Sequence, residues 1–234
     1  MNINKISCVG LVCLSMACVQ NASASDNMFS EYAITGELSS RGLGLNATTN
    51  LTSQLNGRLS LAGFTYSADQ DLDDVSYETD LTLMTAGGLV DWHPFSGGFR
   101  LTTGLFLNFN GLEGSVTPTS TETIDINNTS YSSTELGKLD VEVEYNVVSP
   151  YVGIGWGNPV AKDSNWTFFS DLGILYTGKP SVSLSATPNS SLSATDIATL
   201  NANVAAAQQD IEDEDYLKYL QYYPVFSLGL SYRF

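Results

Sequence analysis

The stretch that decides the fold is FSLGLSYRF, residues 226–234. Every second residue from Phe226 to Phe234 is large and apolar, and the residues between them are polar or small. A period of two places the apolar side chains on one face of a β-strand. A closing strand that ends on an aromatic residue, with another aromatic two positions earlier, is typical of transmembrane β-barrels of Gram-negative outer membranes. The alternative is the last strand of a soluble antiparallel sheet.

The N-terminal segment predicts secretion. Residues 1–24 hold one cation, Lys5, then an apolar run, and end on Ala22-Ser23-Ala24. This is the pattern of a cleaved signal peptide, which leaves residues 25–234 as the barrel domain. Lipidation at Cys18 is the alternative, and it is weakened because Ser15 stands where a lipobox prefers Leu.

The composition excludes several classes of protein. The net charge is −16, and removal of Lys5 with the signal peptide takes it to 8 − 25 = −17, which argues against a nucleic-acid binder. All three cysteines lie within residues 1–24, so the mature chain has no thiol chemistry. The sequence has no run of about 18 apolar residues, so it predicts no membrane-spanning helix. A β-barrel remains, because only alternate residues of its strands need be apolar.

The same alternation recurs in four runs of about ten residues, the length that a tilted strand needs to cross a membrane. They lie near residues 58–66, 99–110, 148–156 and 166–176, with weaker runs at 36–47 and 77–92. The connections alternate between short ones (50–57, 93–98 and 157–165) and long or acidic ones (69–74, 111–140 and 179–221). Short periplasmic turns and long outer loops are the rule in barrels.

Seven strands are evident, whereas bacterial barrels normally have an even number. We expect eight, with the missing strand near residues 27–34, unless the 36–47 run is assigned incorrectly. Aromatic residues near strand ends predict interfacial girdles: Trp92, Trp156, Trp166, Tyr176, Tyr222 and Tyr223.

Residues 194–220 predict a helix within the last outer loop. Ile197, Leu200 and Val204 follow a helical spacing, and Ser193 or Thr195 can cap its start. This acidic helix either covers the mouth of the barrel or is a solvated helix with no gating role.

Two segments resemble a known family: YNVVSPYVGIGWG at 145–157 and DLGILYTGKPSVSL at 171–184. They are similar to the CarO-type outer-membrane proteins of Acinetobacter and relatives, over about residues 139–234. The resemblance implies an eight-stranded barrel with a sizeable extracellular part, associated with the uptake of small basic amino acids such as ornithine and with carbapenem susceptibility. The chain departs from that pattern by ending in Phe234 rather than Trp.

Charged residues within the predicted strands are the candidates for the barrel interior. The strand phase places three arginines toward the lumen (Arg58, Arg100 and Arg233), and three acids are assigned there with them: Glu78, Asp80 and Asp171. A charge that faces lipid at mid-depth costs about 2–4 kcal/mol, so the inward phase is favoured. These residues form either a charged constriction that selects solutes or a salt-bridged plug, because an eight-stranded barrel is just wide enough for side chains to fill.

A metal site is a weak prediction. Asp69, Asp71 and Asp73 have the spacing that begins a calcium loop, but Asp74 and Asp80 stand where such a loop requires Gly and Glu. We interpret the segment as a solvated acidic loop and expect no cofactor.

The only histidine, His93, lies in a predicted periplasmic turn two residues after Asp91. We therefore expect no enzymatic activity.

The sequence thus predicts an all-β, closed antiparallel transmembrane barrel with long acidic extracellular loops. The functional hypothesis is a narrow channel for small solutes that weakly favours cations or basic amino acids. The alternative is a closed structural or adhesion-type barrel without an open pore. The expected partners are outer-membrane lipid and lipopolysaccharide, the barrel assembly machinery through Phe234, and small solutes. A monomer is expected.

Overall fold

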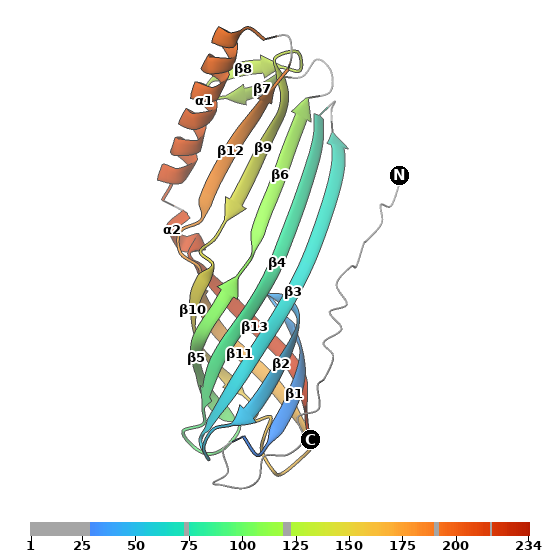
Figure 1. The fold of residues 1–234 in the computed structure, drawn as a ribbon, viewed down its shortest axis with the longest axis vertical. Helices are drawn as coiled ribbons and strands as arrows, with labels where there is room; N and C mark the ends of the chain where they lie inside the picture. Colours follow the sequence, from blue (N-terminus) through green and yellow to red (C-terminus); the bar gives the residue numbers. More distant parts are fainter. Residues whose placement is uncertain (1–28, 73–74, 119–122, 190–191, 216) are drawn as a thin grey trace.

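The structure is a computed structural model that describes residues 29–72, 75–118, 123–189, 192–215 and 217–234. The predicted signal peptide, residues 1–24, lies outside the described residues, and so does Asp73. The molecule has two parts stacked along its long axis: a barrel at the end that holds the C-terminus, and a tall sheet with a helix above it (Figure 1).

Eight antiparallel strands close the barrel in the order β1-β2-β3-β4-β5-β10-β11-β13, and β13 pairs with β1 to complete the circle. Their bounds are β1 Tyr32–Ser39, β2 Gly42–Asn50, β3 Leu55–Leu72, β4 Val75–Trp92, β5 Phe99–Asn108, β10 Val148–Trp156, β11 Trp166–Tyr176 and β13 Tyr222–Arg233. The predicted barrel is therefore confirmed.

The strand missing from the sequence prediction is β1. It forms a hairpin with β2, in which Ser39 pairs with Gly42. The alternating run at 36–47 is thus the end of one strand and the start of the next. The two-residue turn, Ser40 and Arg41, is followed by Gly42, whose φ of 106° is one that glycine favours.

An apolar belt surrounds the barrel. On the neighbouring strands β11 and β13, Trp166 pairs with Tyr232 at one end and Tyr176 with Tyr222 at the other. These positions are ten residues apart (176 − 166 = 10), and a rise of about 3.3 Å per residue at a tilt of about 45° gives a belt about 23 Å tall. Outer-membrane barrels have such a belt, about 25 Å tall, between two aromatic girdles. Tyr223, which we assigned to a girdle, instead points inward and donates a hydrogen bond to the Ser40 carbonyl.

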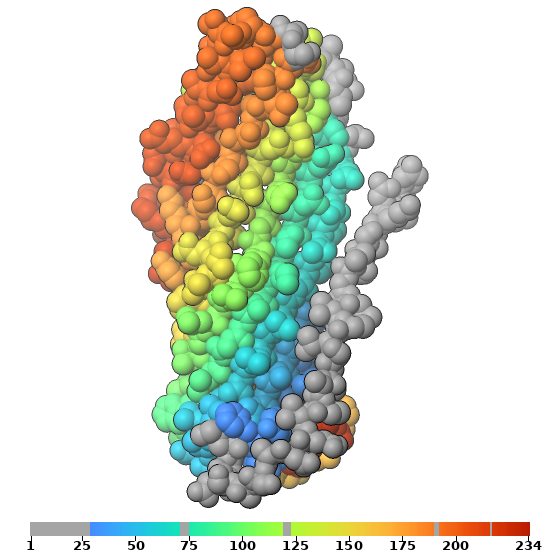
Figure 2. Space-filling view, in the orientation of Figure 1, coloured from blue at the N-terminus to red at the C-terminus, as the bar shows by residue number. Residues whose placement is uncertain are grey.

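The long connections are not loops but a folded extension of the barrel wall, which we call the extension. The outer halves of β3 and β4 continue beyond the belt, where β4 pairs with β6 (Gly111–Pro118). β6 in turn pairs with β9 (Leu136–Glu144), and β9 pairs with β12 (Ser181–Pro188). A hairpin of β7 (Thr123–Ile126) and β8 (Thr129–Ser132) lies above them. In Figure 2, the surface of β3 and β4 runs from the barrel into the extension.

The strand β4 exchanges its polar and apolar faces where it leaves the belt. Within the barrel, Asp91 and Thr85 are buried in the lumen, whereas Val90 and Met84 are exposed on the outside. β4 pairs with β3 without a register shift, so its phase is kept along the whole strand. Beyond Met84, the outward positions therefore become polar and acidic, and the inward ones become apolar.

The predicted helix is α1, Ala194–Asp213, and Ser193 caps it by accepting a hydrogen bond from the Asp196 amide. Leu200 and Val204 pack into an apolar cluster with Leu136, Leu139 and Leu184 on the inward face of β9 and β12. α1 therefore covers the extension and not the mouth of the barrel. A short helix, α2 (Leu217–Leu220), leads into β13. Among the described residues, the helices are too short or too polar to cross a bilayer.

Candidate functional site

Four charged residues meet inside the barrel, and we call them the lumen network: Arg58, Asp91, Arg100 and Asp171. Arg58 donates hydrogen bonds to Asp171 at 2.6 Å and to Asp91 at 2.9 Å. Arg100 donates to Asp171 at 2.8 Å and lies 3.7 Å from Asp91. Each arginine therefore contacts both carboxylates, and the four charges cancel.

The lumen network spans the barrel from wall to wall. Arg58 belongs to β3 and Asp171 to β11, and these strands are four places apart in a circle of eight, directly opposite each other. The hydrogen bond of 2.6 Å between them bridges the lumen at this level. An eight-stranded barrel is narrow enough for side chains to meet in this way.

The network is shielded from water. The side chains of Arg58, Asp91 and Arg100 are at most 1% exposed, and that of Asp171 is 5% exposed. The fully buried ring of Phe169 lies below both guanidinium groups, with its centroid 4.0 Å from Arg100 and 4.9 Å from Arg58. Removing one partner of a buried ion pair costs about 3–5 kcal/mol, because the other charge is left uncompensated.

Arg100 also binds the backbone of the barrel wall. It donates to the carbonyl oxygen of Gly157 at 2.5 Å and to that of Ser170 at 2.9 Å. The side chain runs past Gly155, where an added Cβ would lie 2.6 Å from both the Arg100 guanidinium and the Asp171 carboxylate. Gly155 therefore makes room for the plug.

A second polar group fills the lumen around Arg41, which folds inward from the β1–β2 turn. Arg41 donates to Glu37 at 2.7 Å and to Thr85 at 3.1 Å, and Asn46 donates to the same carboxylate at 2.8 Å. The guanidinium lies 4.5 Å from the centroid of the Phe106 ring on β5, the strand opposite β1. This group also crosses the barrel.

An apolar cluster completes the filling. Its members come from five strands: Leu89, Phe106, Tyr151, Leu175 and Val225. The rings of Phe106 and Tyr151 meet edge to face with centroids 5.6 Å apart. A Cβ at Gly173 would lie 2.4 Å from the Tyr151 hydroxyl, so this glycine is required for the ring to lie across the lumen.

His93 lies in the β4–β5 turn at the periplasmic end of the barrel. It is 1% exposed, its Nε2 lies 3.1 Å from the Asn56 amide nitrogen, and its Nδ1 lies 2.9 Å from the Gly97 carbonyl. The neutral ring satisfies both contacts, with Nδ1 donating and Nε2 accepting. Burial lowers the pKa of His93, which also favours the neutral form. His93 therefore holds the β4–β5 turn.

The structure places Arg233 at the periplasmic rim and not within the plug. It donates to Glu31 at 2.8 Å and to Asn165 at 3.3 Å. The hydrogen bond from Arg233 lowers the pKa of the Glu31 carboxyl. This pair joins the start of β1 to the end of β13.

Glu78 and Asp80 do not face the lumen, which corrects the prediction from the sequence. They occupy the same phase of β4 as the outward-facing Met84 and lie exposed on the outer face of the extension. Asp80 stands opposite Glu113 of β6, which stands opposite Glu142 of β9. The prediction failed because polar residues face the lumen only within the belt, and these lie beyond it.

The weak metal site is also unsupported. The described residues include no group of three or more His, Cys, Asp or Glu able to hold a metal ion. Asp69 is exposed on the outer part of β3, the structure describes only the backbone of Asp71, and Asp73 lies outside the described residues.

Three of the charged residues that fill the lumen were not assigned to it from the sequence: Glu37, Arg41 and Asp91. Glu37 and Arg41 lay in the run that we did not divide into two strands. Asp91 lies between the apolar Val90 and Trp92, and this alternation assigns it to the lumen. Strand phase was therefore a sufficient signal for Asp91.

Comparison with solved structures confirms the fold. CarO2 of Acinetobacter baumannii is 17% identical with a TM-score of 0.53, covering 88% of this chain and 99% of that one. CarO of the same organism is 21% identical with a TM-score of 0.53, covering 86% of this chain and 97% of that one. A major outer membrane protein of Thermus thermophilus matches more loosely, at 14% identity and a TM-score of 0.42 over 87% of this chain and 98% of that one.

No protein-family model and no curated protein matches the sequence significantly. The solved CarO structures confirm the resemblance to CarO-type barrels for the fold, and the chain has the architecture of an outer-membrane barrel protein. This fold and the apolar belt support an integral outer-membrane location.

Proposed function

We propose that this protein is a closed outer-membrane barrel that anchors and displays its extension at the cell surface. The observation that carries the proposal is the hydrogen bond between Arg58 and Asp171, which joins opposite walls of the barrel. The Arg41 group and the apolar cluster cross the lumen as well, so three sets of side chains oppose an open pore. The contacts of His93 at both ring nitrogens support a non-enzymatic role.

A structural or adhesive role fits the extension. More than a third of the chain, including the outer halves of β3 and β4, lies beyond the belt and folds into a sheet with a packed helix. Its outer face carries a row of carboxylates, Asp80, Glu113 and Glu142, on three adjacent strands. Such a face attracts cationic surfaces over about 8 Å at physiological salt.

The narrow, cation-favouring channel predicted from the sequence is the second candidate. The exposed acids above the belt favour it, because they enrich cations beside the barrel. It requires the lumen network to separate during transport. A preference for basic amino acids or any other solute stays a prediction, as do a monomeric state and recognition of Phe234 by the assembly machinery.

Conductance across a planar bilayer distinguishes the two candidates. The purified, refolded wild-type protein is expected to add no ion current. A variant with serine at all four positions of the lumen network leaves no charge uncompensated and is expected to stay closed, because the Arg41 group and the apolar cluster still cross the lumen. A matched control with glutamine at Glu113 and Glu142, on the extension, is expected to stay silent. Steady current through the wild type, or ornithine flux into liposomes that contain it, would overturn the closed barrel and support the channel.

A further inference from the structure

On the lipid-facing surface of the barrel, the small residue Ser170 lies within a row of large apolar ones. Trp156, Ser170, Leu228 and Leu38 are direct partners on the successive strands β10, β11, β13 and β1. Directly paired residues point to the same side of a sheet. Trp156, Leu228 and Leu38 are each more than half exposed, so the row faces outward and Ser170 leaves a depression in it.

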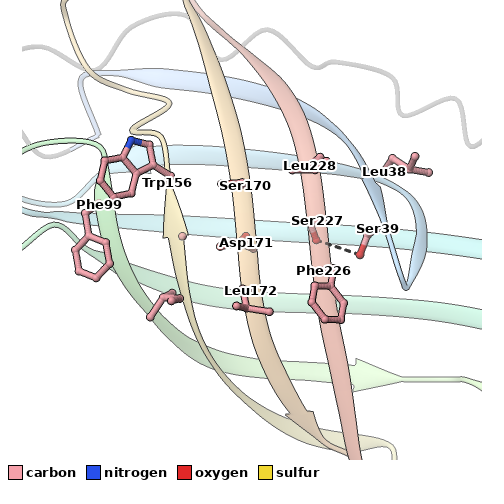
Figure 3. A pocket seen from close by; sticks show the side chains of 12 residues that line it. Leu38, Ser39, Phe99, Trp156, Ser170, Asp171, Leu172, Phe226, Ser227 and Leu228 are labelled. Atoms are coloured by element: carbon pink, nitrogen blue, oxygen red, sulfur yellow. Dashed lines mark hydrogen bonds between the residues drawn. The ribbon is translucent and has the colours of Figure 1, made fainter.

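This depression is the centre of a groove with a volume of about 620 Å³. Trp156 and Phe99 lie on one side of β11, and Phe226 and Leu228 lie on the other, with Leu172 below Ser170 in the view of Figure 3. Gly155 and Ser227 border the groove although they face the lumen, so they contribute their backbone to its floor. We call this depression the lipid groove.

The depth of the lipid groove identifies the medium that fills it. Ser170 is four residues from the periplasmic girdle at Trp166 and six from the outer girdle at Tyr176. With a rise of about 3.3 Å at a tilt of about 45°, it lies about 9 Å inside the periplasmic edge of the belt. The groove therefore faces hydrocarbon of the periplasmic leaflet.

We propose that the lipid groove is a binding site for one acyl chain of a phospholipid from the periplasmic leaflet. Hydrocarbon exerts no hydrophobic force on an apolar surface, so the chain binds through packing alone. A disordered lipid fills the groove poorly, so van der Waals contacts with its walls are lost. An acyl chain that lies between the Trp156 ring and Leu228 makes these contacts along its length. The proposal is independent of whether the barrel conducts.

Filling the groove tests the proposal. The protein is refolded in vesicles of phosphatidylethanolamine and phosphatidylglycerol, extracted, and analysed by native mass spectrometry during stepwise delipidation. The wild type is expected to retain one phospholipid after the others are lost. Ser170→Leu is expected to reduce the retained fraction about fivefold, through the loss of several van der Waals contacts. Ser170→Ala keeps the depression and is expected to retain the lipid.

Gly88→Leu is the matched control. Gly88 is exposed on the outward face of β4, with open space where its Cβ would lie. It pairs with Leu105 of β5, six residues along that strand from Phe99 of the groove. It adds a similar apolar side chain to the belt and is expected to leave lipid retention unchanged. Equal retention by the wild type and Ser170→Leu would overturn the proposal, and so would an equal loss in Gly88→Leu.

A second measurement needs no variant. The wild type in vesicles that contain phosphatidylethanolamine with a diazirine on one acyl chain is irradiated, and the adducts are mapped by mass spectrometry. Adducts concentrated on Trp156, Ser170, Leu172 and Leu228 are expected. An even distribution around the belt would show only annular lipid and would overturn the site.

Discussion

The barrel and the extension share the strands β3 and β4 but arrange their faces in opposite ways. Within the belt, the outward positions of β4 are apolar, as at Val90, and the inward ones include the charged Asp91. In the extension, the outward positions include Asp80, and the inward ones include Leu81 and Tyr77. The strand does not change its phase. Within the belt, the outward face meets lipid and the inward face borders the polar side chains of the lumen. In the extension, the outward face meets water, and on the inward face Leu81 is half-buried and Tyr77 is exposed.

The largest expected effect is on the plug. Asp171→Asn keeps the shape of the side chain but leaves Arg58 and Arg100 with a single buried carboxylate. The free energy of unfolding is expected to fall by about 3–5 kcal/mol, as for other broken buried ion pairs. Guanidinium unfolding of the protein in phospholipid vesicles measures this. Glu142→Gln, on the outer face of the extension, is the control and is expected to change stability by less than about 0.5 kcal/mol. Similar values for the two variants would contradict the distinction between plug and extension.

The next effect compares two outward positions of one strand. Leu61→Lys places a charge near the middle of the belt on β3 and is expected to cost about 2–4 kcal/mol. Ser67→Lys, six residues further along the same face, stands opposite Asp80 and is expected to stabilise by about 0.2–1 kcal/mol through a cross-strand ion pair. Unfolding in vesicles and the heat-modifiable migration of the folded barrel provide the measurements. Equal costs at the two positions would place the membrane boundary elsewhere.

The smallest effect concerns the extension alone. Ser193→Ala removes the N-cap of α1 and is expected to weaken the helix by about 1 kcal/mol. Hydrogen exchange should show faster exchange of the α1 amides and unchanged protection of the barrel strands. Thr199→Ala, within the same helix, is the control and should keep or raise protection, because alanine has the higher helix propensity. Faster exchange in the barrel as well would mean that the two parts unfold together.

Strand phase predicted the belt and the heart of the plug. The outward runs on β5, β10, β11 and β13 and the inward Arg58, Arg100 and Asp171 all follow from a period of two, which the pleat of a strand enforces. The same reasoning failed at Glu78 and Asp80, because it placed these two acids within the membrane-spanning part of β4. The sequence does not mark the level at which a strand leaves the membrane, so the inversion of polarity was missed.

The strands within the outer segments could not be predicted from the sequence either. Residues 111–140 and 179–221 are polar, short of strong alternation and rich in acids, which predicts loops. Their strands are stabilised by pairing with the ends of β4 and with one another. β-propensity depends on such neighbours more than on the local chain. The helix α1, in contrast, was predictable because its cap and its apolar spacing are local.

The sequence by itself determined that the chain forms an outer-membrane type of barrel, because alternation is local and FSLGLSYRF shows it within nine residues. It also determined which arginines of the central strands face inward. Only the tertiary structure decided that Arg58 meets Asp171 from the opposite wall, that Arg41 folds in from a turn, and that Ser170 lies between Trp156 and Leu228. These relations depend on strand order, register and closure, which bring Arg58 and Asp171 together across 113 positions of the chain.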